Sequence, residues 1–474
     1  MADTTMSRRH LLATVGVAGS LSGCSSLGET FSSDSSSGHT LSGEYTITDF
    51  VVRNGATLEL NGTEYRFSGM MALDLTRLDK GKTWINTAMS VAQEYDIDVF
   101  RCWGFSNSKT HASHTAPGEF DDTWLDLFDY TIAKAKEVGV RVIVPLLQGV
   151  HVDSSDENHA FAPSPAAYKN WSETADASWA SGTKQFIEDD QANTFYKEYI
   201  RHVLTRENQY TNTEYRNEPT ILAIECANEL EYRNPDRVGK SLDFWYEDIT
   251  SYIRSFDSNH LLSTGMHGSM GEIYEPWTER CAYVRDHMVD DIDICSFHDY
   301  PLYRAGEGGD AVQIRSEELA RRYATHKIRL AKEEIGKPVY AGEYGATFNP
   351  RASVGYVTKL ETETEASDIE GNARVPMKFL EQHDDGVLVR RKEDISGVDL
   401  DDRIQYFRNL TDVATEHDMD GITFWTLAYD FRPDDATEEE RLRHRIDHDD
   451  LITYPTDDRV LDTIRESGEE VATQ

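Results

Sequence analysis

Short apolar segments and longer amphipathic segments alternate along most of the chain from about residue 65 onward. Apolar runs of about four to eight residues indicate strands buried on both faces, and apolar residues at every third or fourth position indicate helices. The predicted strands are Tyr65–Met71, Asp98–Trp103, Val140–Leu147, Ile221–Ala227, His260–Gly265, Asp293–Phe297, Pro338–Gly342 and Gly421–Leu427. The predicted helices are Trp84–Tyr95, Asp122–Glu137, Asn193–Arg206, Leu242–Phe256, Tyr274–Met288, Ala311–Ile335, Gln405–His417 and Asp457–Ser467. Eight strand–helix units predict an α/β fold, a closed (β/α)8 TIM barrel.

Additional segments precede and interrupt this alternation. Asn61-Gly62, between Phe50–Leu60 and Thr63–Phe67, predicts an N-terminal β-hairpin. Long loops are expected after strand three, over Gln148–Asp190, and after strand seven, over Thr347–Asp399. Loops at the C-terminal ends of barrel strands usually shape a binding cleft, although surface decoration is the alternative for both. The second loop is rich in charge, and the first carries the aromatic residues Phe161, Tyr168, Trp171 and Trp179.

The N-terminal residues 1–24 have the pattern of an export signal. Ser7–Leu12, with its Arg8-Arg9 pair, resembles a twin-arginine motif, and Leu11–Leu21 is too short to span a bilayer. Leu21–Cys24 resembles a lipoprotein processing site, which predicts an extracellular protein tethered to the outer face of the membrane by a lipid on Cys24. The alternative is an ordinary N-terminus with an accidental Arg pair. We predict a Ser/Gly-rich spacer over residues 25–43 and a single folded domain over residues 44–474.

The charge balance is strongly acidic, with 85 Asp and Glu residues against 47 Lys and Arg residues and a net charge of −38. Such a surface argues against nucleic acid or an anionic membrane as a partner. The basic residues comprise 32 Arg and 15 Lys, and an acidic, Lys-poor surface is typical of a protein adapted to concentrated salt. We therefore expect a halophilic protein, an acidic mesophilic enzyme being the alternative. Cys102, Cys226 and Cys295 lie in apolar runs, so we assign them to the core and not to a disulfide or a metal.

Two of the predicted strands end on a carboxyl group. Ile221–Leu230 ends with Asn228-Glu229, and Pro338–Gly345 reaches Glu343, 114 residues later. Catalytic groups of a β/α barrel lie at the C-terminal ends of its strands, and cleavage of a glycosidic bond requires two carboxyl groups. Either Glu alone could cap a helix or pair with an Arg. Two at equivalent strand ends indicate a glycosidase.

The chain resembles the retaining glycoside hydrolases of family 5 and, within them, the endo-β-1,4-mannanases. The resemblance spans about Phe50 to the C-terminus. It rests on Val99–Phe105, Phe195–Arg206, Asn217–Ile221, Ala227–Glu229, His298–Pro301, Gly342–Gly345 and Phe424-Trp425. It implies a barrel that cleaves β-1,4-mannosidic bonds within mannan or glucomannan by double displacement, without a metal or cofactor. We expect a monomer.

The resemblance also implies a role for each polar residue at the strand ends. Glu229 would be the general acid/base and Glu343 the nucleophile, with their carboxyl groups about 5–5.5 Å apart. Arg101 would lie beside Glu343 and hold it ionised, its alternative being a structural ion pair within the barrel. Asn228 would bind the sugar 2-OH.

Four further residues complete the expected substrate site. Tyr300 would donate a hydrogen bond to the nucleophile, and His298 would line the same subsite unless it is an ordinary core histidine. Trp425 would stack on the sugar ring. Trp103 would form a wall or a subsite, and a place in the core is its alternative.

The sequence departs from the family pattern at two places. Leu230 follows Asn228-Glu229 where the family usually has Pro, and Gln148–His151 replaces an Asn-Asn-Trp-like segment. The second departure leaves the preference for mannose over glucose open, with His151 as a possible substitute for a histidine of related cellulases. An endoglucanase, an exo-β-mannosidase, a transglycosylase and a non-catalytic carbohydrate-binding barrel remain alternatives. Asn61, Asn170 and Asn409 begin N-glycosylation motifs.

Overall fold

The structure is a computed structural model. It describes residues 41–43, 45–106, 112–149, 162–173, 186–230, 241–268, 283–305, 311–315, 317–360, 387–429, 437, 440 and 450–472. The chain divides into two units, Met1–His39 and Thr40–Gln474, and every described residue belongs to the second. The predicted export signal, the lipid site at Cys24 and most of the spacer lie outside the described residues. No helix in the ranges given above is both long and apolar enough to span a bilayer.

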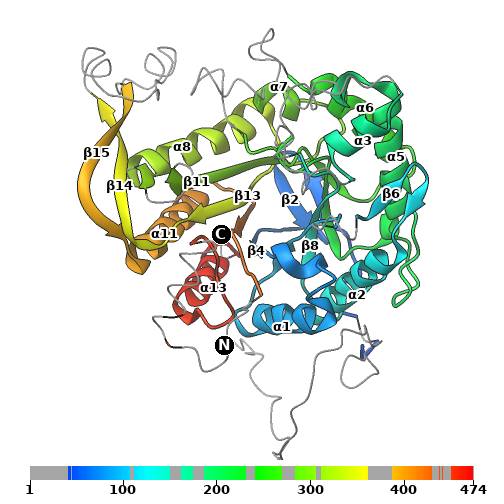
Figure 1. The fold of residues 1–474 in the computed structure, drawn as a ribbon, viewed down its shortest axis with the longest axis horizontal. Coiled ribbons are helices and arrows are strands. Elements are labelled where there is room, and N and C mark those ends of the chain that lie inside the picture. The colour runs from blue at the N-terminus through cyan, green and yellow to red at the C-terminus, as the bar shows by residue number, and fades with distance from the viewer. Residues whose placement is uncertain are drawn as a thin grey trace, which may run out of the picture. The chain divides into compact units, whose positions relative to one another are not determined.

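Within the described residues, eight parallel strands form the predicted (β/α)8 barrel (Figure 1). Their order around the barrel is β10, β9, β8, β5, β4, β16, β13 and β11. A parallel bridge between Ser263 and Ile294 joins the two ends, next to β10 and β11. The strands are β4 (Phe67–Met71), β5 (Val99–Arg101), β8 (Arg141–Pro145), β9 (Ile221–Glu225), β10 (Leu261–Ser263), β11 (Cys295–Ala305), β13 (Val339–Ala346) and β16 (Gly421–Phe424).

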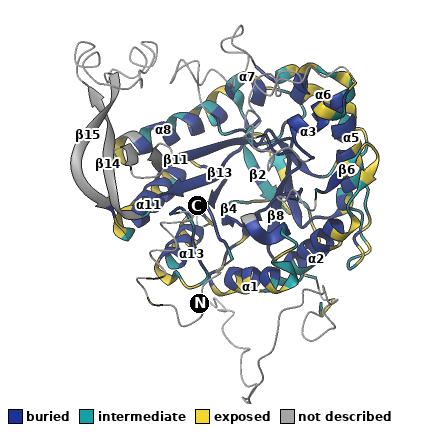
Figure 2. Ribbon diagram, viewed as in Figure 1, coloured by how far each residue is buried: buried dark blue, intermediate teal, exposed yellow. Residues whose placement is uncertain are grey.

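Helices surround these strands (Figure 1), with buried faces toward the sheet and exposed residues on the outside (Figure 2). They are α1 (Gly81–Glu94), α2 (Asp122–Val138), α3 (Pro165–Trp171), α5 (Asp190–Leu204), α6 (Asp243–Arg254), α7 (Tyr283–His287), α8 (Glu317–Arg329), α11 (Leu400–Glu416) and α13 (Asp458–Ala472). A π-helical turn, Leu330–Ile335, extends α8, and 3-10 turns cover Leu73–Thr76 and Tyr215–Asn217. Aspartates fix several starts: the side chain of Asp121 accepts from Thr123 N and Trp124 N at the N-terminus of α2, and Asp189 and Asp399 cap α5 and α11.

The N-terminal hairpin is confirmed. β2 (Thr57–Leu60) and β3 (Thr63–Glu64) are joined by Asn61 and Gly62, whose φ angles of 55° and 77° are the positive values that a tight two-residue turn needs. β1 (Val52–Asn54) pairs antiparallel with β2, so the segment predicted as one strand is two. Val51 and Leu58 share a hydrophobic cluster with residues in or next to the barrel strands, namely Phe67, Val99, Ile143, Leu222, Ala223, Leu261, Ile294 and Tyr340. Most of these lie toward the N-terminal ends of their strands, so the small sheet packs against that end and leaves the opposite end for chemistry.

One prediction about the second half of the chain is wrong, and another is incomplete. The first residues of the predicted helix Ala311–Ile335 form a strand, β12 (Ala311–Arg315), which pairs antiparallel with the extended end of β11. The predicted loop after strand seven contains β14 (Asn349–Leu360) and β15 (Val387–Val398), an antiparallel ribbon that projects from the barrel (Figure 1). β14 pairs with β12, so these three strands continue the barrel sheet. Pairing with distant segments overrides local pattern, which is why the sequence misled here.

Candidate active site

Glu229 lies just beyond the C-terminal end of β9, and Glu343 lies in the C-terminal half of β13. Glu343 is directly opposite His298 in the pairing of β13 with β11. One carboxylate oxygen of each glutamate and a ring nitrogen of His298 all lie within 4.8 Å of one another. Glu343 is almost fully buried, at 3 % exposed, whereas 19 % of the Glu229 side chain is exposed. Glu229 is therefore the more accessible of the two glutamates.

The backbone at Glu229 has an unusual conformation. Its φ angle is 52°, in the left-handed region that a residue with a side chain adopts at a cost of about 1–3 kcal/mol. Backbone hydrogen bonds on both sides hold the turn: Asn228 N donates to Leu147 O at 2.7 Å, and Glu229 N donates to Gly265 O at 2.8 Å. Leu230, which replaces the family's usual Pro, is 1 % exposed. Packing and neighbouring strand ends thus fix a turn that Pro would otherwise stiffen.

Arg101 is the centre of the polar network beneath the two glutamates. Its Nη1 donates to Glu343 Oε1 at 2.7 Å, and its Nη2 donates to Asn228 Oδ1 at 2.6 Å. Its Nε and Nη2 also donate to the two oxygens of Glu225, at 2.9 and 2.6 Å. Tyr340 Oη donates to Glu225 Oε1 at 2.5 Å. Arg101 and Glu225 are both 0 % exposed, so Arg101 contacts the predicted nucleophile and also forms the structural ion pair that was its alternative.

Tyr300 and His298 contact the two glutamates from β11. The Tyr300 hydroxyl donates a short hydrogen bond to Glu343 Oε2. His298 Nδ1 lies 2.5 Å from Glu229 Oε1 and 3.5 Å from Glu343 Oε2. Two glycines make room for these rings: a Cβ at Gly342 would lie 2.8 Å from His298 Nε2, and one at Gly345 would lie 2.3 Å from Tyr300 Cε1. The sequence Gly342–Gly345 thus places one glycine before the glutamate and one after it, each against an aromatic partner.

Burial dominates the electrostatics of this cluster. It lowers the pKa of His298 to about 3, so the imidazole is neutral at ordinary pH. Burial also raises the pKa of Glu343 above its ordinary value, and the nearby charge of Glu229 adds to that rise. Arg101 and the hydrogen bond from Tyr300 oppose it. The pKa of Tyr300 is raised well above its ordinary value, first by burial, so its hydroxyl remains a donor.

The two tryptophans predicted for the substrate site differ in exposure. Trp425 is partly exposed, and its ring meets that of Tyr300 at 72°, with the centroids 6.2 Å apart. Trp103 is only 3 % exposed and packs between Phe105 and the guanidinium of Arg101, 5.3 Å from its ring centroid. Trp425 therefore has some surface available to a sugar, whereas Trp103 has little and mainly packs against Phe105 and Arg101.

The aromatic residues of the loop after strand three are placed only in part. Tyr168 is fully buried and hydrogen-bonds His114 Nδ1 through its hydroxyl at 3.0 Å. Trp171 is partly buried and packs against the same core. Phe161, Trp179 and His151 lie outside the described residues. Tyr168 is thus a core residue and not a stacking surface.

Residues outside the expected set also enter the site. Sequence reasoning missed Glu225 because it lies in an apolar strand. The signal that could have revealed it is that a lone carboxylate in a buried strand needs a buried cation as its partner. Gln148 follows β8, and its Oε1 accepts from Asn228 Nδ2 at 3.3 Å. The sequence feature that could have revealed Gln148 is its position at the end of predicted strand three, which corresponds to the position of Asn228 at the end of predicted strand four.

Glu229, His298 and Glu343 are also the arrangement in the described structure that could hold a metal ion. A cation there would face the guanidinium of Arg101, which already neutralises Glu343. The site is therefore better suited to proton transfer than to metal binding.

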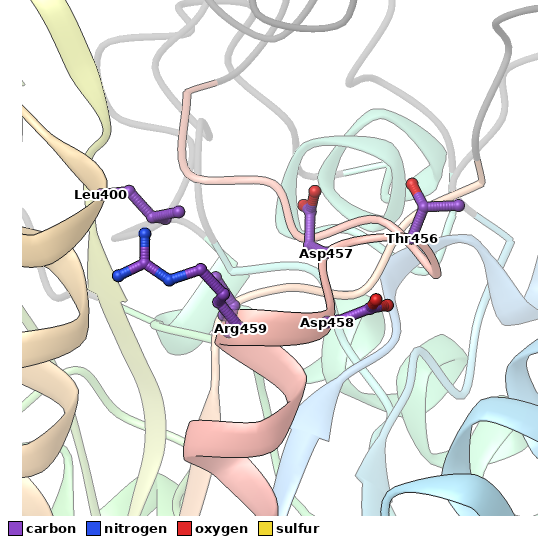
Figure 3. Close-up of a pocket in the computed structure, with 6 residues that line it drawn as sticks. Leu400, Thr456, Asp457, Asp458 and Arg459 are labelled. Atoms are coloured by element: carbon purple, nitrogen blue, oxygen red, sulfur yellow. The ribbon is translucent and has the colours of Figure 1, made fainter. Parts of the chain in front are cut away.

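A cavity of about 240 Å³ lies elsewhere, at the start of α13 (Figure 3). Arg459 extends toward Leu400 in this view, and Asp458 points the other way. Arg459 forms an ion pair with Asp401, and Asp458 accepts from Tyr95 Oη at 3.0 Å. None of the residues that line this cavity belongs to the cluster around Glu229 and Glu343, so the cavity is not a candidate for the chemistry.

A closed β/α barrel with two clustered glutamates at its strand ends defines the class of barrel glycoside hydrolases. A family model described as GH family 5 beta-mannosidase-like matches residues 49–449, and the chain belongs to that family. The mannan endo-1,4-beta-mannosidase 5 of Solanum lycopersicum is 27 % identical over 310 residues, which cover 62 % of this chain and 70 % of that relative.

Two solved structures illustrate the likeness in fold. The endo-beta-1,4-mannanase from Thermotoga petrophila has a TM-score of 0.62 and 24 % identity, covering 87 % of this chain and 78 % of its own. A family 5 mannosidase from Rhizomucor miehei has a TM-score of 0.62 and 15 % identity, covering 90 % and 99 %. The barrel prediction is thus confirmed, and the chain is a glycoside hydrolase.

Proposed function

We propose that this chain is a retaining endo-1,4-β-mannanase that cleaves mannan or glucomannan by double displacement. The observation that carries the mechanism is the approach of Glu229 and Glu343, with one oxygen of each within 4.8 Å. Retaining glycosidases hold their two carboxyl groups about 5–5.5 Å apart, whereas inverting enzymes need about 6.5–9.5 Å to admit a water. The name of the tomato relative supports the choice of substrate.

Glu343 is the nucleophile in this proposal. Both of its oxygens accept hydrogen bonds, one from Arg101 and one from Tyr300, and these donors favour the ionised form. Its carboxylate attacks the anomeric carbon and forms the glycosyl-enzyme as the glycosidic C–O bond breaks. Water then cleaves that ester, which restores the free carboxylate.

Glu229 is the general acid/base. Its greater exposure places it where the leaving-group oxygen and later the attacking water arrive. It gives its proton to the leaving oxygen in the first step and takes one from water in the second. The neutral ring of His298 orients its carboxyl group without adding a charge.

Asn228 and Trp425 would bind the sugar being cleaved. Asn228 is next to Glu229, and its amide can donate to the sugar 2-OH, a contact that strengthens in the transition state of this reaction. Trp425 offers a partly exposed ring to the pyranose face.

The mechanism is tested by the stereochemistry of an aryl β-mannobioside, followed by NMR during the first turnovers. We expect the β-anomer first, and an initial α-anomer would overturn the proposal. Glu343→Gln should lower the rate by several orders of magnitude. In Glu229→Gln, added azide should restore transfer of the glycosyl group from the enzyme, because azide needs no general base, whereas attack by water should stay slow. Glu333→Gln, at an exposed glutamate paired with Arg329, is the matched control and should leave the rate unchanged.

The endo action and the substrate are tested together by product size. The purified protein is given mannan, glucomannan, cellulose and xylan in molar salt. Rapid loss of viscosity with a ladder of manno-oligosaccharides supports the proposal. Mannose alone would indicate an exo-β-mannosidase, and products from cellulose an endoglucanase. Carbohydrate binding without product would identify a non-catalytic barrel.

We further propose that the protein acts outside the cell, exported by the twin-arginine route and anchored through Cys24. The support is the sequence of residues 1–24 alone. Changing Arg8 and Arg9 to Lys should retain the protein in the cytoplasm, and an unchanged location would overturn the route. Of the possible glycan sites, Asn61 and Asn170 are exposed, but Asn409 is 4 % exposed and hydrogen-bonds Glu317, which disfavours a glycan there.

A further inference from the structure

Gln148 and Asn228 are neighbours at the same level of the barrel rim. An isolated parallel bridge joins the two residues just beyond β8 and β9, and Gly149 N donates to Asn228 O at 2.8 Å. The approach is so close that a Cβ at Gly149 would lie 2.4 Å from Asn228 O. Gln148 N donates to Pro163 O at 3.1 Å, which ties it to the segment that begins α3. The Gln148 side chain, 9 % exposed, is therefore held against that of Asn228.

The hydrogen bonds fix the direction in which each amide points. A guanidinium has donors and no acceptor, so the atom of Asn228 that meets Arg101 Nη2 at 2.6 Å must be its oxygen, Oδ1. Asn228 Nδ2 then faces Gln148, whose atom at 3.3 Å must be the acceptor Oε1. Nδ2 carries two hydrogens, so one remains for a ligand while the other is held by Gln148.

We infer that Gln148 is a positioning residue for the proposed reaction: it holds the Asn228 amide so that its second N–H meets the hydroxyl at C2 of the sugar. This inference rests on the proposed function. Without the acceptor at residue 148, the Asn228 amide keeps its bond to Arg101 but loses the restraint on its nitrogen. The contact with the 2-OH then weakens most in the transition state, where it is strongest, so kcat falls more than KM rises.

The test is a thermodynamic cycle in which a substitution at residue 148 is combined with removal of the 2-OH from the substrate. Wild type, Gln148→Leu and Gln148→Glu are assayed with an aryl β-mannobioside and an aryl β-cellobioside, and with the matching disaccharides that lack the 2-OH on the sugar bound to the aryl group. Leu removes the acceptor at similar size, whereas Glu keeps an acceptor for Asn228 Nδ2. Gln405→Leu, on α11, applies the same change to a glutamine that hydrogen-bonds Asn409 away from the site. Thermal unfolding shows that each variant is folded.

We expect Gln148→Leu to lower kcat on the 2-hydroxy substrate by about 10-fold or more, and on the 2-deoxy substrate by less than about 3-fold. Gln148→Glu should retain most of the dependence on the 2-OH, and Gln405→Leu should match wild type. Equal losses on both substrates would indicate a structural role and overturn the inference, as would loss of the 2-OH dependence in Gln148→Glu. If wild type hydrolyses no mannobioside, the proposed substrate is wrong, and the cycle is then decided on whichever sugar series wild type cleaves.

Discussion

A methyl group at Gly345 should lower the activity of the proposed nucleophile, Glu343, by displacing a neighbouring side chain. In Gly345→Ala the new Cβ would lie 2.3 Å from Cε1 and 2.4 Å from Cδ1 of Tyr300, against an ordinary contact of at least 3.4 Å. The Tyr300 ring must therefore move by about 1 Å, because β13 is buried on both sides and cannot yield easily. That shift breaks the hydrogen bond from the Tyr300 hydroxyl to Glu343.

The expected loss follows from this one contact. A hydrogen bond to a charged group contributes about 1.5–3 kcal/mol, which corresponds to about a 10- to 150-fold lower kcat/KM. Tyr300→Phe removes the same hydroxyl and should lose a similar factor. Because both changes remove one interaction, the double variant should be no more than about 3-fold slower than the slower single variant.

The pH profile gives an independent readout of the same contact. The Tyr300 hydrogen bond lowers the pKa of Glu343, so its removal raises that pKa further. A nucleophile must be ionised, so the acidic limb of kcat/KM should move to higher pH in Gly345→Ala and in Tyr300→Phe.

The assay uses an aryl β-mannobioside, and Gly468→Ala in α13 is the control. There the nearest atom to the new Cβ is Ser68 Cβ at an ordinary 3.6 Å, so neither rate nor pH profile should change. A wild-type rate in Gly345→Ala, or losses that multiply in the double variant, would refute the argument that Gly345 acts through Tyr300.

Three further outcomes are expected. Burial lowers the pKa of His287 to about 3 from an ordinary 6.5, so the native state binds fewer protons than the unfolded state between these two pH values. The free energy of unfolding should therefore fall by up to about 5 kcal/mol from pH 6.5 to pH 3. Urea titrations should show a weaker pH dependence of this free energy in His287→Gln. If the net charge of −38 reflects salt adaptation, the midpoint of thermal unfolding should fall on dialysis from molar salt into dilute buffer, and an unchanged midpoint would contradict it. Cys24→Ser should release the protein from membranes into the medium, as followed by cell fractionation.

The barrel was predictable because its strands are buried on both faces and leave continuous apolar runs. The same runs marked the ends near which Glu229 and Glu343 lie, and the structure brings both together with Arg101, Asn228 and Tyr300. Their proximity needs only that all the parallel strands of a barrel end at one rim, which the fold class supplies.

What the sequence could not supply depends on contacts between distant segments. β12, β14 and β15 pair with one another and with the extended β11, and no local pattern records such pairing. The burial of Trp103 depends on Phe105 and Arg101 surrounding it, and an exposed subsite tryptophan would have the same sequence context. Residue type and spacing thus predict where the polar groups gather, but not which of them face solvent.

The donor chemistry of Arg101 links the stability of the barrel to the order of the site. Its guanidinium, fully buried, directs N–H groups to Glu225, Glu343 and Asn228 at the same time. A lysine offers three donors from one point and cannot span three acceptors on two strands and a turn. Because a buried carboxylate without its partner is strongly unfavourable, the pair with Glu225 keeps Arg101 in place even when no sugar is bound. Arg101 in turn holds the oxygen of Asn228 and leaves its amide nitrogen for other partners. The ion pair within the barrel therefore also determines that Asn228 presents a hydrogen-bond donor at the rim.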